Sequence, residues 1–205
     1  IAGWAGEKAE EWAATDPASA LKQTWLNDHL AQLDMVLDKA RDAYDIIDLH
    51  LYRDPETIPA RIDYFRARMK SLGYPTPKPM WVTETGGPDT RWPYGDFTTK
   101  PVDLAFYELS PEVRQAEVVK RFVLSLSAGA ERVFWFQLGA TRAPQGIWDG
   151  MALVWGERRN PAFATYALTV EKLKGYDAIQ RLNLGTGVSA FQFRRPVGDT
   201  YVLWA

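Results

Sequence analysis

Strand-like and helix-like segments alternate along most of this 205-residue chain, and this order limits the fold more than any other feature. Strands are recognised by alternating apolar and polar residues, and helices by apolar residues three or four positions apart. Four strand–helix pairs result: residues 1–4 with about 25–42, 44–52 with 59–72, 79–87 with 110–126, and 131–137 with 161–173. Such alternation predicts a parallel sheet covered by helices.

The connections between these segments differ in length. Turns after helices are short, and Gly73 and Gly175 are well placed to end two of the helices. Connections after strands are long and contain Pro, Gly and aromatic residues, as in residues 86–109. Long connections at the carboxyl ends of strands are typical of α/β proteins whose site lies at that edge.

A polar face on the strands distinguishes a barrel from an open doubly wound sheet, in which both faces are covered and apolar. Residues 44–52 place Asp48, His50 and Tyr52 on one face. Residues 131–137 place Val133, Trp135 and Gln137 on one face, opposite Phe134 and Phe136. Such strands suit a TIM barrel, which needs eight strands and about 250 residues. Four units therefore predict half of a barrel, over residues 1–175.

The end of the chain changes character. Helical spacing stops near residue 176, residues 188–193 and 200–204 alternate, and Pro196-Val-Gly-Asp199 is typical of a turn. A β-hairpin is predicted, and residues 176–205 form a second region that begins a β-sandwich-like appendage. Because this region stops in mid-strand and the first holds half of a barrel, we expect the sequence to be part of a longer protein.

Charge and composition exclude several functions. Basic and acidic residues number 24 and 26, so no nucleic-acid or anionic-membrane partner is expected. No apolar run approaches the roughly 20 residues of a membrane helix. Without cysteine and with two histidines, neither a metal site nor a cofactor is expected. The compartment stays undecided, with secretion or a periplasmic location among the options.

Aromatic residues make up 13% of the chain, and several lie in loops rich in Gly and Pro. These are Trp92, Tyr94, Trp148 and Trp155. Packing within the loops explains any one of them. A cluster of loop tryptophans is also a way to build a carbohydrate site, because apolar faces of sugars stack on aromatic rings while polar groups bind the hydroxyls.

Glu84 is the candidate catalytic residue. It ends the strand at residues 79–87 and stands just before a pair of glycines, which places a carboxylate at the mouth of the expected barrel. A surface glutamate paired with an arginine is the simpler alternative. His50 and Tyr52 of the preceding strand favour the catalytic interpretation, because both could donate hydrogen bonds that keep a carboxylate nucleophile ionised.

Three further residues complete the predicted site. Trp135, on the strand that follows Glu84 in the chain, is expected to hold a sugar against the nucleophile. Gln137 at the end of the same strand and Trp148 in the next loop are expected to bind substrate. Residues at successive strand ends converge on one edge of a parallel sheet.

These segments resemble the clan A retaining (β/α)8 glycoside hydrolases, whose nucleophile ends strand seven. The matching pieces are Asp48-Leu-His-Leu-Tyr52 for strand six, Trp81-Val-Thr-Glu-Thr-Gly86 for strand seven and Phe134-Trp-Phe136 for strand eight. The helix at Asn160-Pro-Ala-Phe-Ala-Thr-Tyr166 and the hairpin after it resemble the β-xylosidase/α-iduronidase-like family. The resemblance implies a partial TIM barrel, strands five to eight with their helices, followed by the start of a small β-domain.

The resemblance also implies a reaction. In that clan the strand-seven glutamate attacks the anomeric carbon, and a second glutamate protonates the leaving oxygen and then activates water. The match gives Glu84 the role of nucleophile, lets Tyr52 steady it, and brings Trp135 and His50 to the sugar. The substrate implied is an oligosaccharide, polysaccharide or glycoside.

One element of the clan pattern is missing. The acid/base glutamate of the clan follows Asn at the end of strand four, and no Asn-Glu pair occurs in this sequence. We therefore expect a glycosidase fragment that carries the nucleophile, lacks the acid/base and needs the N-terminal half of the barrel as its partner.

Two other interpretations stay open. A non-catalytic carbohydrate-binding or degenerate TIM-barrel relative would explain the loop aromatics without an acid/base residue. A complete flavodoxin-like protein that binds a phosphate ligand would need a Gly-rich loop after the first strand, and Gly3-Trp-Ala-Gly6 is too sparse for that.

Overall fold

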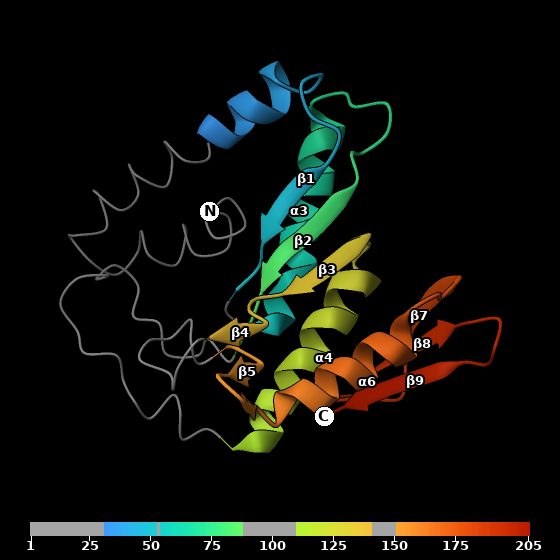
Figure 1. Ribbon diagram of the computed structural model, residues 1–205. Helices are drawn as coiled ribbons and strands as arrows, with labels where there is room; N and C mark the ends of the chain where they lie inside the picture. Colours follow the sequence, from blue (N-terminus) through green and yellow to red (C-terminus); the bar gives the residue numbers. More distant parts are fainter. Residues whose placement is uncertain (1–30, 53, 88–109, 141–150) are drawn as a thin grey trace, which may run out of the picture.

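The computed structural model describes residues 31–52, 54–87, 110–140 and 151–205. Its central feature is a parallel sheet of three strands in the order β1-β2-β3. The strands are β1 (Ile47–His50), β2 (Met80–Thr85) and β3 (Arg132–Trp135). The helix α3 (Ile58–Ser71) joins β1 to β2, and α4 (Pro111–Ser127) precedes β3 (Figure 1). The predicted α/β order is confirmed here, whereas the strand predicted at residues 1–4 lies outside the described residues.

Local sequence explains where these helices begin and end. A short 3-10 helix, η1 (Pro55–Thr57), leads into α3, and the Asp54 carboxylate accepts a hydrogen bond from the Glu56 amide at 2.9 Å. Ser110 caps α4 with its side-chain oxygen, and a proline follows at the first helical position. Gly73 and Gly129 have φ angles of 76° and 93°, a left-handed conformation that suits glycine just past a helix end.

One hydrophobic core joins the sheet to its helices. Ile47 and Leu49 of β1 are buried, while Asp48 and His50 between and after them are exposed. The buried strand residues pack with apolar side chains of both helices: Ile58, Ile62, Phe65 and Met69 of α3, and Val118, Phe122, Val123 and Leu124 of α4. The helices therefore cover one face of the sheet, as the alternation in residues 44–52 predicts. Closure of the sheet into a barrel stays a prediction.

A second, small sheet follows β3. It consists of β4 (Gly139–Ala140), β5 (Val154–Trp155) and β6 (Arg158–Arg159), and leads into α6 (Ala162–Leu173). The buried side chain of Asn160 fixes this junction: it accepts a hydrogen bond from the Ala162 amide at 3.0 Å and donates one to the Ala152 carbonyl at 3.1 Å. The expected helix start at residues 160–161 is confirmed.

The C-terminal residues form an antiparallel sheet in the order β7-β8-β9. Its strands are β7 (Ala178–Leu182), β8 (Ser189–Arg194) and β9 (Thr200–Trp204). The predicted hairpin is β8–β9, and β7 is an additional strand that the sequence pattern did not reveal. Phe191 and Phe193 of β8 belong to the same core as α4, and Figure 1 shows α4 and α6 between the two larger sheets. The division of the chain near residue 175 stays a prediction.

No helix within the part of the chain that the structure describes has the length and apolar character needed to cross a bilayer.

Candidate active site

A bulge in β2 decides which way Glu84 points. On β1, the residues Leu49 and His50 are consecutive, but their partners on β2 are Val82 and Glu84. Across β3, Val82 and Thr85 pair with Val133 and Trp135, so β2 again holds one residue more than its neighbour. Regular alternation would turn Glu84 to the same face as buried Val82. The extra residue instead places Glu84 opposite His50, on the face that α3 and α4 do not cover, called the uncovered face with respect to the described residues.

Glu84 is held by two side chains from the end of β1. The Tyr52 hydroxyl donates a hydrogen bond of 2.7 Å to Glu84 Oε2. His50 Nδ1 lies 3.2 Å from the same oxygen, and its Nε2 lies 3.7 Å from Asp48 Oδ2. The Thr83 hydroxyl donates to the other Asp48 oxygen. The structure therefore brings together the three residues that the sequence analysis predicted: Glu84, Tyr52 and His50.

This arrangement suits a reactive carboxylate. The Glu84 side chain is 33% exposed and that of His50 is 44% exposed, so a molecule in solution can reach both. The Tyr52 hydroxyl donates to Oε2 and His50 Nδ1 lies close to the same oxygen, so both neighbours restrict the position of the carboxylate. The other oxygen, Oε1, takes no part in these two contacts. A fixed, accessible carboxylate is the group that a nucleophilic displacement needs.

The aromatic neighbour of the site is Phe136 rather than Trp135. The rings of Phe136 and Tyr52 meet edge to face, with centroids 6.3 Å apart. Trp135 pairs in register with buried Thr85, packs against the hydrophobic core and donates its indole N–H to the Met151 carbonyl at 2.8 Å. The strand alternates as expected, and Trp135 lies on the face covered by helices; its predicted role as a platform for the sugar stays a prediction.

The opposite face of β3 carries a second aromatic pair. Phe134 and Trp81 lie with ring centroids 6.4 Å apart, and the guanidinium of Arg132 stands 5.2 Å from the Trp81 ring centroid. Phe134 is 46% exposed. Together with Glu84 and His50, these side chains make the uncovered face of the sheet both aromatic and charged.

The remaining predicted residues lie at or beyond the end of β3. Gln137 is half-buried, and its carbonyl accepts a hydrogen bond from the Leu153 amide at 3.0 Å. The peptide bond that precedes it is cis. Trp155 is half-buried in β5, where the Arg114 guanidinium lies 5.8 Å from its ring centroid. Trp148, Trp92 and Tyr94 lie outside the described residues.

Beneath the site lies a buried polar network that sequence reasoning missed. Arg121 of α4 is fully buried; it donates to the Leu51 carbonyl at 3.2 Å and to the Thr85 hydroxyl at 3.3 Å. The Thr85 hydroxyl in turn donates to the Leu51 carbonyl at 2.6 Å. Glu117, one turn earlier on α4, accepts a hydrogen bond of 2.8 Å from Arg121 Nε, and its Oε2 lies 2.8 Å from Arg121 Nη2 in an ion pair. The available signal was a Glu and an Arg four residues apart on the apolar side of a helix.

Electrostatics in this network balance burial against pairing. Burial raises the pKa of the Glu117 carboxyl above its ordinary value, and the adjacent Arg121 charge opposes that shift.

The glycine pair after Glu84 fits closely around these groups. A Cβ on Gly87 would lie 2.3 Å from Glu117 Oε2, and one on Gly86 would lie 2.3 Å from the Phe136 carbonyl oxygen. Both positions require glycine because of close approach.

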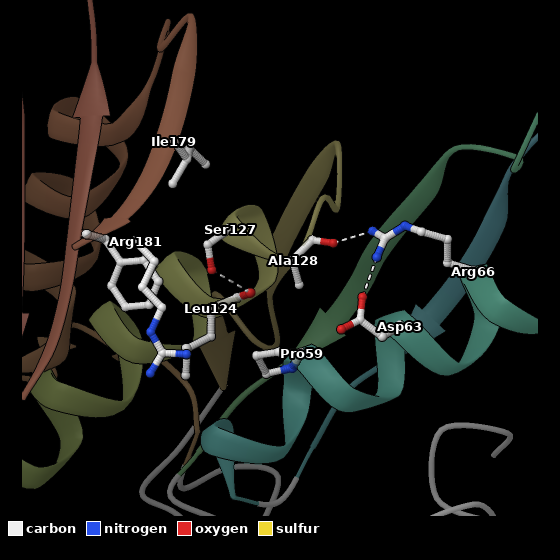
Figure 2. Close-up of a pocket in the computed structure, with 9 residues that line it drawn as sticks. Pro59, Asp63, Arg66, Leu124, Ser127, Ala128, Ile179 and Arg181 are labelled. Atoms are coloured by element: carbon white, nitrogen blue, oxygen red, sulfur yellow. Dashed lines mark hydrogen bonds and ion pairs between the residues drawn. The ribbon is translucent and has the colours of Figure 1, made fainter. Parts of the chain in front are cut away.

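A separate groove of roughly 230 Å³ lies between α3, α4 and the β7–β8 strands. Figure 2 shows Arg66 on its wall, donating to Asp63 and to the Ala128 carbonyl, while Arg181 reaches in from β7. Neither Glu84 nor its partners line this groove. Within the described residues, no group of three or more carboxylates and histidines is arranged to hold a metal ion.

The described residues therefore form an α/β protein with a parallel sheet and a partly exposed, hydrogen-bonded carboxylate at the end of its middle strand. The family model described as glycosyl hydrolase catalytic core matches residues 7–137, which is more than half of the chain. This chain belongs to the glycosyl hydrolase catalytic core family.

A solved structure shares the fold. A family 39 glycoside hydrolase from the gut symbiont Bacteroides cellulosilyticus WH2 superposes with a TM-score of 0.59 at 17% sequence identity. The match covers 83% of this chain and 36% of that chain, so this chain spans little more than a third of that protein's length. Comparison with curated proteins gave no match.

Proposed function

We propose that this chain carries the nucleophile of a retaining glycoside hydrolase, and that Glu84 is that nucleophile. Membership of the glycosyl hydrolase catalytic core family supports the reaction class. The single observation that favours Glu84 is its geometry: a carboxylate at the end of the middle strand, with Oε2 bound by Tyr52 at 2.7 Å and close to His50 at 3.2 Å. A structural glutamate would instead be expected to pair with an arginine or lysine.

The proposed reaction has two displacements. Glu84 attacks the anomeric carbon of a glycoside, a carbon–oxygen bond forms to the carboxylate, and the bond to the leaving oxygen breaks. An acid delivers a proton to that oxygen. Water then attacks the same carbon, gives up a proton to the acid's conjugate base and releases Glu84. The Tyr52 hydroxyl holds the carboxylate in position before each step.

We further propose that the acid/base residue is supplied from outside this sequence, because no Asn-Glu pair is present. The two carboxyl groups of a retaining enzyme lie about 5–5.5 Å apart. Without the acid/base carboxyl group, we expect glycosides with poor leaving groups to react about 10²–10⁴-fold more slowly than they would with it. Activated glycosides, whose leaving group departs without protonation, should lose much less. Fast hydrolysis of an unactivated phenyl glycoside by this chain alone would contradict this part of the proposal.

A covalent trap tests the nucleophile directly. The 2,4-dinitrophenyl 2-deoxy-2-fluoro-β-D-xyloside and its glucoside analogue have a leaving group that departs without protonation, so the acid/base residue is not needed. The fluorine slows the second displacement, so that the glycosyl-enzyme accumulates. We expect intact mass spectrometry to show one added glycosyl unit, and peptide mapping to locate it on Glu84, with no label in Glu84→Gln.

The same experiment separates the proposal from its main alternative. A non-catalytic carbohydrate-binding protein would show saturable sugar binding by calorimetry or ligand-observed NMR and no covalent adduct. Uncovered aromatic side chains such as Phe134 make that outcome physically reasonable. A folded chain that binds sugar and takes up no label at Glu84 would favour the binding protein.

A further inference from the structure

Two backbone segments must stay in register for Tyr52 to reach Glu84. Tyr52 lies just beyond β1, and Glu84 lies within the bulge of β2, where the regular strand pairing is interrupted. The amide of Leu51 donates to the Glu84 carbonyl at 2.8 Å, and the amide of Phe136 donates to the Thr85 carbonyl at 2.8 Å. A bulge weakens the ladder at the place where side-chain position matters most.

The buried network spans this interruption from below. Leu51 directly precedes Tyr52, and Thr85 directly follows Glu84. The Thr85 hydroxyl donates to the Leu51 carbonyl at 2.6 Å and accepts from Arg121 at 3.3 Å, while Arg121 also donates to the Leu51 carbonyl at 3.2 Å. Each group therefore binds the other two, and the triangle ties the residue before Tyr52 to the residue after Glu84.

A buried arginine is costly unless its charge and its N–H groups are satisfied. Arg121 meets this condition through Glu117 on its own helix and through the two strand-end oxygens. A second arginine, Arg61 of α3, is 4% exposed and donates to the Tyr52 carbonyl at 2.7 Å. Planar, multiply bonded guanidinium groups hold acceptors in fixed directions, which lysine does not do.

We propose that Thr85 and Arg121 are positioning residues, which set the distance and orientation between Tyr52 and Glu84 across the β2 bulge. This inference rests on the proposed function only for its effect on reaction rate. The structural part of the inference is independent of the proposed function: loss of the triangle should weaken the Tyr52–Glu84 hydrogen bond. Thr85 and Arg121 act through their neighbours and do not touch the substrate.

The central test is Thr85→Val, which removes the hydroxyl at nearly constant volume, compared with Thr85→Ser, which keeps it. Thr169→Val is the matched control, because Thr169 is also a buried threonine but lies on α6. The readout is the ¹⁹F NMR chemical shift of the protein labelled with 3-fluorotyrosine. The resonance of Tyr52 is the one that disappears in Tyr52→Phe. Its chemical shift in Glu84→Gln serves as the reference for a Tyr52 hydroxyl without the carboxylate acceptor. We expect Thr85→Val to move this resonance toward that position, and Thr85→Ser and Thr169→Val to leave it in place.

The covalent trap supplies the second measurement. We expect Thr85→Val to lower the maximal rate of Glu84 labelling by about five- to tenfold, no more than removal of the Tyr52 hydroxyl does, because Thr85 acts through that hydrogen bond. The concentration of fluoroglycoside at half-maximal rate should change less than threefold, because Thr85 does not touch the sugar. If Thr85→Val does not fold, Arg121→Lys takes its place, since lysine keeps the charge beside Glu117 but lacks the fork that reaches both strand ends.

The outcomes separate the two proposals. Failure to label the folded wild-type chain overturns the proposed function, and the Tyr52 resonance then decides the positioning role by itself. An unmoved Tyr52 resonance in Thr85→Val, or in Arg121→Lys where that replaces it, overturns the positioning role. Wild-type labelling with an unchanged rate in the variant also overturns it. A moved resonance that Thr85→Ser restores supports it.

Discussion

Charged side chains on the two faces of the sheet at the end of β2 differ in their exposure and in how fully they are paired. On the uncovered face, Glu84 and His50 are partly exposed, and Glu84 Oε2 is contacted by Tyr52 and by His50. On the helix-covered face, Arg121 is fully buried and its N–H groups are shared among Glu117, Thr85 and the Leu51 carbonyl. Glu84 and Thr85 are consecutive residues, yet one faces solvent and the other faces the network.

This difference shows how one strand end can serve both reactivity and rigidity. A reactive carboxylate must be accessible to its substrate, and it needs one oxygen that the protein does not bind. A buried arginine that stabilises the fold needs a partner for every N–H donor, because an unpaired buried group costs free energy. Substitutions of Glu84 and Tyr52 should therefore change chemistry with little effect on folding. Substitutions in the buried network should lower stability, and should reach the chemistry only through the positions of Tyr52 and Glu84.

Glu84→Gln should have the largest effect on chemistry. We expect loss of covalent labelling, because the amide is a poor nucleophile, while the free energy of unfolding changes by no more than about 0.5 kcal/mol, as for a partly exposed surface position. Intact mass spectrometry and urea unfolding measure the two quantities. A label that persists on another carboxylate of the variant would move the nucleophile away from Glu84.

Arg121→Met should have the largest effect on stability. Removing one partner of a buried ion pair leaves Glu117 unpaired, which costs about 3–5 kcal/mol. We expect the urea midpoint to fall accordingly. The double variant Arg121→Met, Glu117→Leu should recover part of this loss, because no buried charge remains. A single variant as stable as the wild type would show that the network does not support the covered face.

Gly87→Ala should destabilise the fold by about 1–3 kcal/mol, the usual range for overpacking. The added Cβ would meet Glu117 Oε2 at 2.3 Å and the Arg121 guanidinium at 2.7 Å. Gly73→Ala is a useful comparison, because an added Cβ there meets no atom within 4 Å and the cost comes from its positive φ alone. Thermal unfolding measures the stability of both variants. An equal loss of stability in the two would contradict close packing beneath Glu84.

Tyr52→Phe should slow labelling of Glu84 by about tenfold, which corresponds to roughly 1.4 kcal/mol, close to the lower end of the range for a hydrogen bond to a charged group. The phenyl ring keeps its edge-to-face contact with Phe136. Stability should change little, because the hydroxyl lies on the partly exposed face. The rate constant from time-resolved mass spectrometry is the readout, and an unchanged rate would show that Tyr52 does not steady the nucleophile.

Trp135→Phe should have the smallest effect on chemistry. Its indole donates to the Met151 carbonyl and packs on the covered side, so we expect a loss of about 1 kcal/mol in stability and a labelling rate within threefold of wild type. Phe136→Ala is the counterpart on the other side and should slow labelling more. A large rate loss in Trp135→Phe with Phe136→Ala unaffected would restore Trp135 as the platform.

The sequence alone predicted much of the described fold. Alternating strands and helices with capping residues such as Ser110 placed β1, α3, β2, α4, β3 and α6 correctly, because these signals are local. The strand β7 was missed, since residues 178–182 are mostly exposed and gain their order by pairing with β8. Closure of a parallel sheet into a barrel depends on pairing between strands that are distant in sequence, so it is not a local property.

The candidate site divides in the same way. That Tyr52, His50 and Glu84 would meet followed from their positions at the ends of neighbouring parallel strands, which is fixed by residue order and chain direction. The face on which Glu84 stands was decided only in three dimensions. Strict alternation from Val82 would have buried it, and the β2 bulge turned it outward. A bulge arises from pairing between strands, whose energies depend on residues distant in sequence, and so the sequence of β2 by itself does not specify it.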